Sequence, residues 1–279
     1  MTTKRLVHGD DLLYRFFQTG LETRAELFAA VPQLLATTMG VWLPLDAYER
    51  WPVLLPWIVR DPQCRGNSRK GLRDEWSSPD DRGYLRDDNS LIKGLPRALS
   101  ISGPKGSHLH DARMGSEFVA CHIWRIVDHT DLASRHPLLN SFIPNLVWLP
   151  GQVAKLSDRQ GGVIQRTLEA VSYAVYRDAP VLPHLRPIAE EAWDMIPPPT
   201  VTLQDFAPTD LNWFRTTSAF FRTRTSRLDS VIEALDAIDQ GLPLGERVVT
   251  RRYAAGLPLV PHADRSALKV HLGRFRKRE

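Results

Sequence analysis

Apolar residues recur at three- and four-residue spacing through residues 10–60. This pattern predicts helices over LLYRFFQ and AELFAAVPQLLATTM. Pro32 interrupts the second run, so we expect it near a helix start or at a helix break. Tryptophans at positions 42, 51 and 57 follow in a segment punctuated by prolines. We expect them to pack in the core rather than to stack on bases.

Residues 60–113 are dense in Gly, Pro, Ser, Asp and Arg and contain only short apolar stretches. We expect long loops around one short helix near residues 90–98, capped by Asn89 or Ser90. Two interpretations of the basic side chains remain open, a phosphate-binding surface or pairing with the neighbouring acidic residues. The basic residues concerned are Arg65, Arg69, Lys70, Arg73, Arg82, Arg86 and Lys93.

Residues 117–124 alternate as a strand that is apolar on both faces, so His122 near its end should face an interior cleft. A second strand is predicted over 145–149 and ends at Pro150. A helix can open after it and should break at Gly161 and Gly162, before an amphipathic helix over 163–177. The predicted order is strand, loop, strand, helix.

The last hundred residues are expected to be helical. A proline-rich hinge over 180–200 encloses the short helix AEEAWDM, and LDSVIEALDAI beyond it has one apolar face. A basic terminal helix should start at Asp264. We therefore predict an α+β fold that is mostly helical. It has three regions: a helical region with long loops (1–113), the strand–strand–helix unit (114–180) and a basic helical region (181–279).

Composition limits the class of protein. The 279 residues are 43% hydrophobic and 24% charged, which is enough for a substantial core. No apolar run reaches membrane-spanning length, the start of the chain lacks the apolar core of a signal peptide, and a cytoplasmic location is expected. Two cysteines exclude a disulfide framework and a four-cysteine zinc site.

Charge is unevenly distributed. The net charge is +4, yet residues 211–279 alone carry +6, from 13 Arg and Lys against 7 Asp and Glu. A basic final third suits a polyanion such as nucleic acid, although arginines that merely solvate helices would give the same count.

The combination of EFVACHIWR, a loop, IPNLVWLP and a helix resembles the HNH, or ββα-metal, nucleases. The resemblance covers about a quarter of the chain. It implies that His122 activates water as a general base and that Asn145 ties the loop and orients the histidine. It also implies a bound Mg²⁺, or another divalent cation such as Mn²⁺, which would offset charge on the phosphate.

Two positions depart from the family pattern. Cys121 stands where the family commonly has an Asp or His metal ligand, and a thiolate is a poor ligand for Mg²⁺. The helix position nine residues after Asn145 is Ala154, so Asp158, one turn further on, is the replacement metal ligand we expect.

A competing register also exists. Asp128 and His129 form an Asp-His pair 16 residues before Asn145, a spacing closer to the shorter members of the family. Their sequence context is polar and loop-like, which favours His122, but both registers remain open. Asp131 and His136 are further candidates for the lining of this loop.

The expected function is therefore a metal-dependent DNA endonuclease of restriction or phage-defence type, acting on double-stranded DNA. One active site of this kind cuts one strand, so a double-strand break requires a homodimer or two successive nicks. The basic tail would contact phosphates, and its candidate residues are Arg274, Arg276, Lys277 and Arg278. The alternatives are a DNA-binding protein with a degenerate, inactive HNH unit, and a structural protein whose basic tail is incidental.

Overall fold

The computed structural model describes residues 25–61, 64, 77–105, 107–127, 131–245 and 248–276. The fold is α+β, and helical residues outnumber strand residues, as predicted. The helices are α2 (Ala25–Thr38), α3 (Leu45–Arg50), α5 (Ser90–Gly94), α6 (Gly151–Ser157), α7 (Val163–Tyr176), α8 (Arg186–Asp194), α9 (Ser218–Asp239), α10 (Arg251–Gly256) and α11 (His262–Gly273). Within the described ranges, no helix is both long and apolar enough to cross a membrane.

The strands are short. They are β1 (Val41–Trp42), β2 (Ile58–Arg60), β3 (Leu85–Asp87), β4 (Ile101–Ser102), β5 (Phe118–His122), β6 (Ile126–Val127), β7 (Asp131–Leu132), β8 (Leu146–Pro150) and β9 (Asn212–Phe214). Five of them form one mixed sheet in the order β4-β9-β1-β8-β5. Only the β1–β9 pair in this sheet is parallel. Two small two-stranded sheets, β2–β3 and β6–β7, lie outside it.

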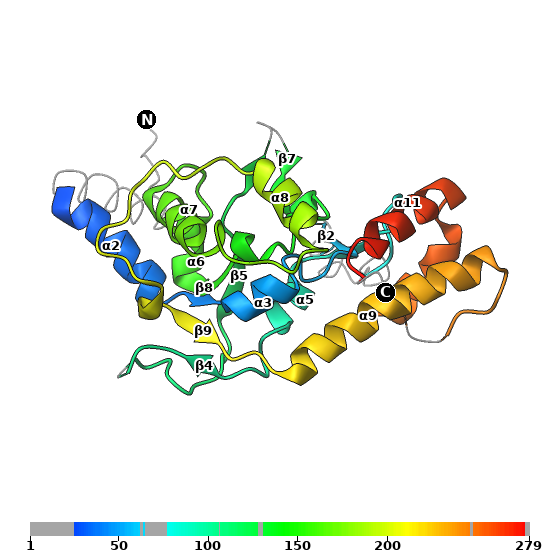
Figure 1. Ribbon diagram of the computed structural model, residues 1–279, viewed down its shortest axis with the longest axis horizontal. Helices are drawn as coiled ribbons and strands as arrows, with labels where there is room; N and C mark the ends of the chain where they lie inside the picture. The colour runs from blue at the N-terminus through cyan, green and yellow to red at the C-terminus, as the bar shows by residue number, and fades with distance from the viewer. Residues whose placement is uncertain are drawn as a thin grey trace, which may run out of the picture.

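The five-stranded sheet draws on all three regions that the sequence suggested. β1 and β4 come from residues 1–113, β5 and β8 from 114–180, and β9 from 181–279. A single cluster of buried apolar side chains also spans these regions. Figure 1 shows the sheet beside α2, α6 and α7, with the long α9 leading away from it toward α11.

Buried tryptophans form much of the core. Trp42, Trp57 and Trp148 are fully buried, and Trp51 is 9% exposed, so the expectation that the tryptophans near position 50 pack internally is confirmed. Trp193 contacts the rings of Trp124 and Phe142 edge to face, with centroids 5.9 and 5.4 Å apart. These contacts attach α8 to the loop that follows β5.

Several predicted elements are confirmed. α7 begins at Val163 directly after the two glycines, and α5 begins after Asn89, although the Asn89 side chain makes no capping hydrogen bond. The face of α9 that carries Leu228, Ile232 and Leu235 is buried, as the sequence pattern indicated.

Other expectations were wrong. Pro32 lies inside α2 rather than at a helix start or a break. A proline inside a helix removes one hydrogen bond, and the packing of α2 against α7 offsets that loss. β1 and β2 lie within residues 10–60, which were expected to be helical. β9 lies just before α9, in the final region that was also expected to be helical. The terminal helix begins at His262, with Asp264 in its first turn.

Candidate functional site

The strand–strand–helix segment is built around the β5–β8 hairpin. β5 and β8 pair antiparallel, with His122 opposite Leu146 at the end of the ladder. Asn145 closes a short 3₁₀ turn (Ile143–Asn145) immediately before β8. α6 starts directly after β8 and packs on both strands. β5, β8 and α6 follow one another in the predicted order, but the segment between the two strands contains the small β6–β7 sheet that was not predicted.

His122 is held by one strong hydrogen bond. Its imidazole is 8% exposed, and its Nε2 lies 2.8 Å from the backbone oxygen of Asn140. A carbonyl oxygen can only accept, so Nε2 carries the proton and Nδ1 is the acceptor nitrogen of the neutral ring. Nδ2 of Asn89 donates a long hydrogen bond to Nδ1, at 3.5 Å. The ring is thus fixed in one tautomer with Nδ1 as its acceptor.

Burial controls the protonation of this histidine. Burial, together with the positive charges of Arg60 and Arg125, lowers the pKa of His122 from 6.5 to about 4, against the opposing effect of its hydrogen bonding to Asn140. The imidazole is therefore neutral at neutral pH. A neutral ring can accept a proton, but a group with so low a pKa is a weak base.

Asn145 joins both sides of the loop. Its side chain is fully buried, its Oδ1 accepts a hydrogen bond from the Trp124 amide at 2.7 Å, and its Nδ2 donates to the Leu139 oxygen at 3.0 Å. The backbone oxygen of Asn145 also accepts from the Ile123 amide at 3.0 Å. These hydrogen bonds connect the residues that follow β5 to the residues that precede β8. They therefore fix the position of the Asn140 carbonyl relative to His122.

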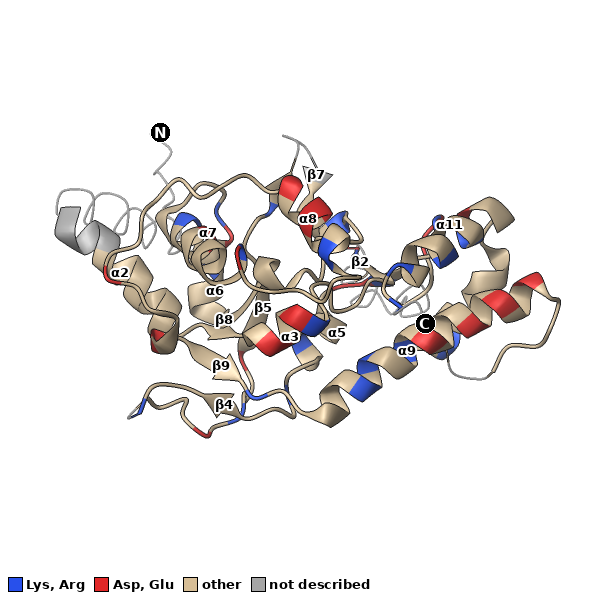
Figure 2. Ribbon diagram, viewed as in Figure 1, with Lys and Arg blue, Asp and Glu red and all other residues tan. Residues whose placement is uncertain are grey.

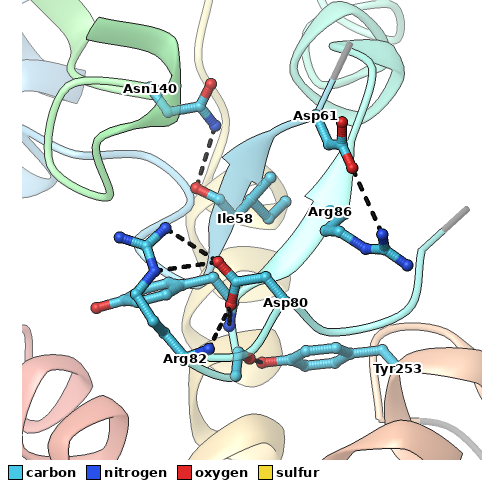
Figure 3. Close-up of polar contacts among 9 residues, drawn as sticks. Ile58, Asp61, Asp80, Arg82, Arg86, Asn140 and Tyr253 are labelled. Atoms are coloured by element: carbon cyan, nitrogen blue, oxygen red, sulfur yellow. Dashed lines mark hydrogen bonds and ion pairs between the residues drawn. The ribbon is translucent and has the colours of Figure 1, made fainter. Parts of the chain in front are cut away.

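Two further asparagines surround His122, and the sequence did not single them out for this role. Asn140 is 1% exposed, and its Nδ2 donates to the Ile58 oxygen of β2 at 3.1 Å (Figure 3). Asn89 has a left-handed backbone (φ 75°) at the start of α5. The Oδ1 atoms of both asparagines are buried and have no hydrogen-bond donor among the described residues. Each of these two oxygens is therefore an acceptor that a buried water molecule could satisfy.

The arginine-rich loops are partly neutralised by their own carboxylates. Asp80 accepts hydrogen bonds from Nε and Nη2 of Arg82 at 3.1 and 2.9 Å, and Arg86 lies 3.5 Å from Asp61 (Figure 3). For these pairs the structure agrees with internal pairing rather than with a free phosphate-binding surface. The candidates Arg65, Arg69, Lys70 and Arg73 lie outside the described residues.

The position expected to hold a metal has a poor set of donors. Burial raises the pKa of the Cys121 thiol to about 12, so this thiol stays protonated. The Ser157 hydroxyl donates to the Ala154 oxygen at 2.7 Å. Asp158 is exposed at the end of α6, close enough for its charge to raise the pKa of Cys121.

In the part of the chain that the structure describes, no group of three or more His, Cys, Asp or Glu side chains could hold a metal ion. A protonated thiol, a hydroxyl and one carboxylate do not fit Mg²⁺, which prefers several hard oxygen ligands. Asp128 and His129 of the competing register lie outside the described residues. His136 follows β7, and its Nδ1 accepts from the Leu138 amide at 3.3 Å.

The basic residues near the end of the chain are engaged within the fold. Arg274 forms an ion pair with Glu191 of α8, and Nε of Arg276 donates to Asp229 of α9 at 2.9 Å. Both arginines stay partly exposed, at 36% and 48% of their side chains. Lys277 and Arg278 lie outside the described residues.

In comparisons with known proteins, no family model, no curated protein and no solved structure matches the chain.

Proposed function

We propose that the protein is an endonuclease that hydrolyses phosphodiester bonds in double-stranded DNA, with His122 as the general base. The observation that supports this proposal is the tautomer of His122. Its Nε2 donates to the Asn140 oxygen at 2.8 Å, and its Nδ1 is an oriented acceptor whose hydrogen bond from Nδ2 of Asn89 is long, at 3.5 Å. A positioned, neutral imidazole is the group that removes a proton from water in such reactions.

In the proposed reaction, Nδ1 of His122 takes a proton from water while the water oxygen attacks phosphorus. The bond from phosphorus to the 3′ oxygen breaks, and that oxygen leaves with the electron pair and is protonated by solvent. Arg60 and Arg125 supply positive charge near the ring, since both lower the pKa of His122. The same charges would favour a phosphate group at this position.

A divalent cation, when bound, would stabilise charge on the phosphate. The described donors around Cys121 and Asp158 do not fit such an ion, so dependence on Mg²⁺ or Mn²⁺ remains a prediction from the family resemblance.

We further propose a restriction or phage-defence role in the cytoplasm. A homodimer, or two successive nicks, would produce a double-strand break.

The burial of His122 favours a second candidate, a DNA-binding protein whose HNH-like unit no longer cuts. An imidazole that is 8% exposed, with a pKa of about 4, resembles a structural histidine as much as a catalytic one. In that case the hydrogen bond to Asn140 serves to close the loop, and DNA binding would depend on the exposed basic side chains.

Incubation of supercoiled plasmid with the purified protein in Mg²⁺, Mn²⁺ or EDTA tests the first proposal. We expect nicked circles with the divalent cations, and loss of nicking by roughly 10²–10⁴-fold in His122→Ala. His262→Ala is the matched control, because His262 is an exposed histidine on α11. Loss of nicking in His129→Ala alone would identify the Asp128–His129 register. Salt-dependent DNA binding without nicking by the wild-type protein would select the second candidate.

A further inference from the structure

A pocket of about 400 Å³ lies between α5 and the first turns of α9. Its walls are mostly apolar and include Leu55, Leu91, Leu95, Leu99 and Phe220. Its polar lining residues include Thr217, Thr223, Arg224 and Arg227. The volume falls within the range of small-molecule binding sites, about 300–1,000 Å³. An apolar pocket with two arginines among its lining residues suits a ligand that is partly apolar and partly anionic.

Arg224 is unusual among the residues that line this pocket. Its side chain is 1% exposed, and its Nε and Nη1 have no hydrogen-bond partner among the described residues. Its one hydrogen bond in the described chain is a long one, from Nη2 to the Val53 oxygen at 3.5 Å. The guanidinium also lies 4.2 Å from the centre of the Trp51 ring. A buried charge without a counter-ion is costly, so this site is energetically incomplete.

Among the residues that the structure describes, no carboxylate forms an ion pair or a hydrogen bond with Arg224. Burial lowers the pKa of this guanidinium, the positive charge of Arg227 lowers it further, and no carboxylate of the described chain offsets either effect.

The distribution of charge along α9 also favours an anion at this end of the helix. Arg222, Arg224 and Arg227 lie in its first half, whereas its acidic residues, including Asp236 and Asp239, lie in its second half (Figure 2). This is the reverse of the order that the helix dipole favours. α11 neutralises the acidic half, for example through Lys269 beside Asp236 and Asp239. The basic half begins at the pocket, where the amide groups of the first helical turn also favour an anion.

We propose that this pocket binds a small amphiphilic anion, with a carboxylate or phosphate head paired to Arg224 and an apolar body between α5 and α9. The head would satisfy the open Nε and Nη1 donors of Arg224, and Arg227 at the exposed edge would add a second positive charge. The body would bury the leucine-lined wall. This inference does not depend on the nuclease proposal, because no residue of the His122 site lines the pocket.

Isothermal titration calorimetry with three ten-carbon probes tests the inference on the full chain, at concentrations below micelle formation. The probes are decanoate, decyl phosphate and decanol. We expect at least one of the two anions to bind at least about tenfold more tightly than decanol, because a charge-assisted hydrogen bond is lost with the neutral head. The tighter of the two anions identifies the preferred head group. Equal affinity for decanol would overturn the proposal.

Variants locate the binding. Arg224→Met should weaken binding of the anion at least about tenfold, whereas Arg222→Met, at an exposed arginine of the same helix, should leave it unchanged. Gly94→Leu provides a test that leaves Arg224 intact. Gly94 lines the pocket, a Cβ there meets nothing within 4 Å, and the larger side chain should block the site while α5 still folds. Unchanged affinity in folded Arg224→Met or in Gly94→Leu would place the ligand elsewhere and refute the assignment.

Discussion

At the residue level, the side chains of His122 and Asn145 both form hydrogen bonds with backbone atoms of the segment between β5 and β8. His122 bonds to the oxygen of Asn140, and Asn145 bonds to the Trp124 amide and the Leu139 oxygen. All these groups are inside the protein, where an unpaired polar group costs about 1–3 kcal/mol. The loop between β5 and β8 therefore owes its shape to a few side chains, each of which can be tested separately.

The pKa of His122 predicts how stability depends on pH. The pKa is about 4 in the folded chain, below the ordinary 6.5, so the unfolded chain binds a proton first as pH falls. The contribution of His122 is complete above pH 6.5 and is lost as pH falls toward 4, by up to about 3 kcal/mol. Urea unfolding of wild type and His122→Gln from pH 7 to pH 4 should show a smaller loss in the variant. His262→Gln, at an exposed position, should behave like wild type, and a variant slope equal to the wild-type slope would contradict the assigned pKa.

Asn145→Ala should cost about 2–4 kcal/mol of unfolding free energy, because it leaves the Trp124 amide and the Leu139 oxygen without partners. Gln152→Ala, at an exposed position on α6, should change stability by no more than about 0.5 kcal/mol. Urea unfolding measures both variants. A loss below about 1 kcal/mol for Asn145→Ala would mean that the loop is closed mainly by other contacts.

The sequence pointed to His122 and Asn145 because His122 stands near the end of one apolar strand pattern and Asn145 stands at the start of the next. Asn89 and Asn140 could not be assigned to the site in this way. Asn89 lies 33 residues before His122, and Asn140 lies 18 residues after it. Their positions beside the ring depend on how α5 and the loop fold back, and no local pattern encodes that. The low pKa of His122 could not be predicted from the sequence either, because its main cause is burial by residues from distant parts of the chain.

At the level of elements, α9 and α11 form a pair held together by charge as well as by apolar contacts. Lys269 and Arg276 of the α11 segment face Asp236 and Asp229 of α9. Such partly exposed ion pairs contribute little individually, about 0–1 kcal/mol each. Their main effect is to reduce the positive electrostatic potential of this surface, because they neutralise arginines and lysines that the sequence alone would count as free.

This pairing changes the expected effect of the basic tail on DNA binding. Arg274→Gln combined with Arg276→Gln should lower the slope of log K against log salt by less than one unit in total, because both arginines already have carboxylate partners. Two free phosphate contacts would instead lower it by nearly two units. Fluorescence anisotropy with a labelled duplex across a salt series measures the slope. A fall of nearly two units would show that DNA displaces Glu191 and Asp229 from these arginines.

Long amphipathic elements were easier to predict than short buried ones. α7 and α9 present a periodic apolar face, and the glycines before α7 mark its start. β1 and β9 consist of two and three residues, too few for any alternation to stand out from a helical pattern. Their strand conformation comes from hydrogen bonds to partners far away in sequence, which also explains why the mixed sheet could not be foreseen.

At the level of the whole molecule, Asn212 connects distant parts of the fold. Its fully buried side chain donates to the backbone oxygens of Thr37, Thr38 and Gly40, and its Oδ1 accepts from the Ser107 hydroxyl at 3.2 Å. It thereby caps the end of α2 from a strand that follows much later in the chain.

Asn212→Ala should lower the free energy of unfolding by about 2–4 kcal/mol, since several buried carbonyl oxygens lose a donor. The matched control is Gln33→Ala, because Gln33 also joins α2 to a late segment, through Gln204, but does so at an exposed position. Thermal and urea unfolding would give the comparison. Equal losses in the two variants would argue against the buried cap as the stronger connection.

The middle position of β1 in the sheet also has a consequence for synthesis on the ribosome. β1 can pair with β8 once residue 148 has emerged, but its other edge stays open until Asn212 and Trp213 arrive to pair with Val41 and Trp42. During that interval the nascent chain displays an unpaired, wholly apolar strand edge, of the kind to which a second chain can add. Closing so long a segment is also slow relative to local helix formation. Chaperone supply and translation speed, rather than the stability of the finished fold, should then set the yield of native protein.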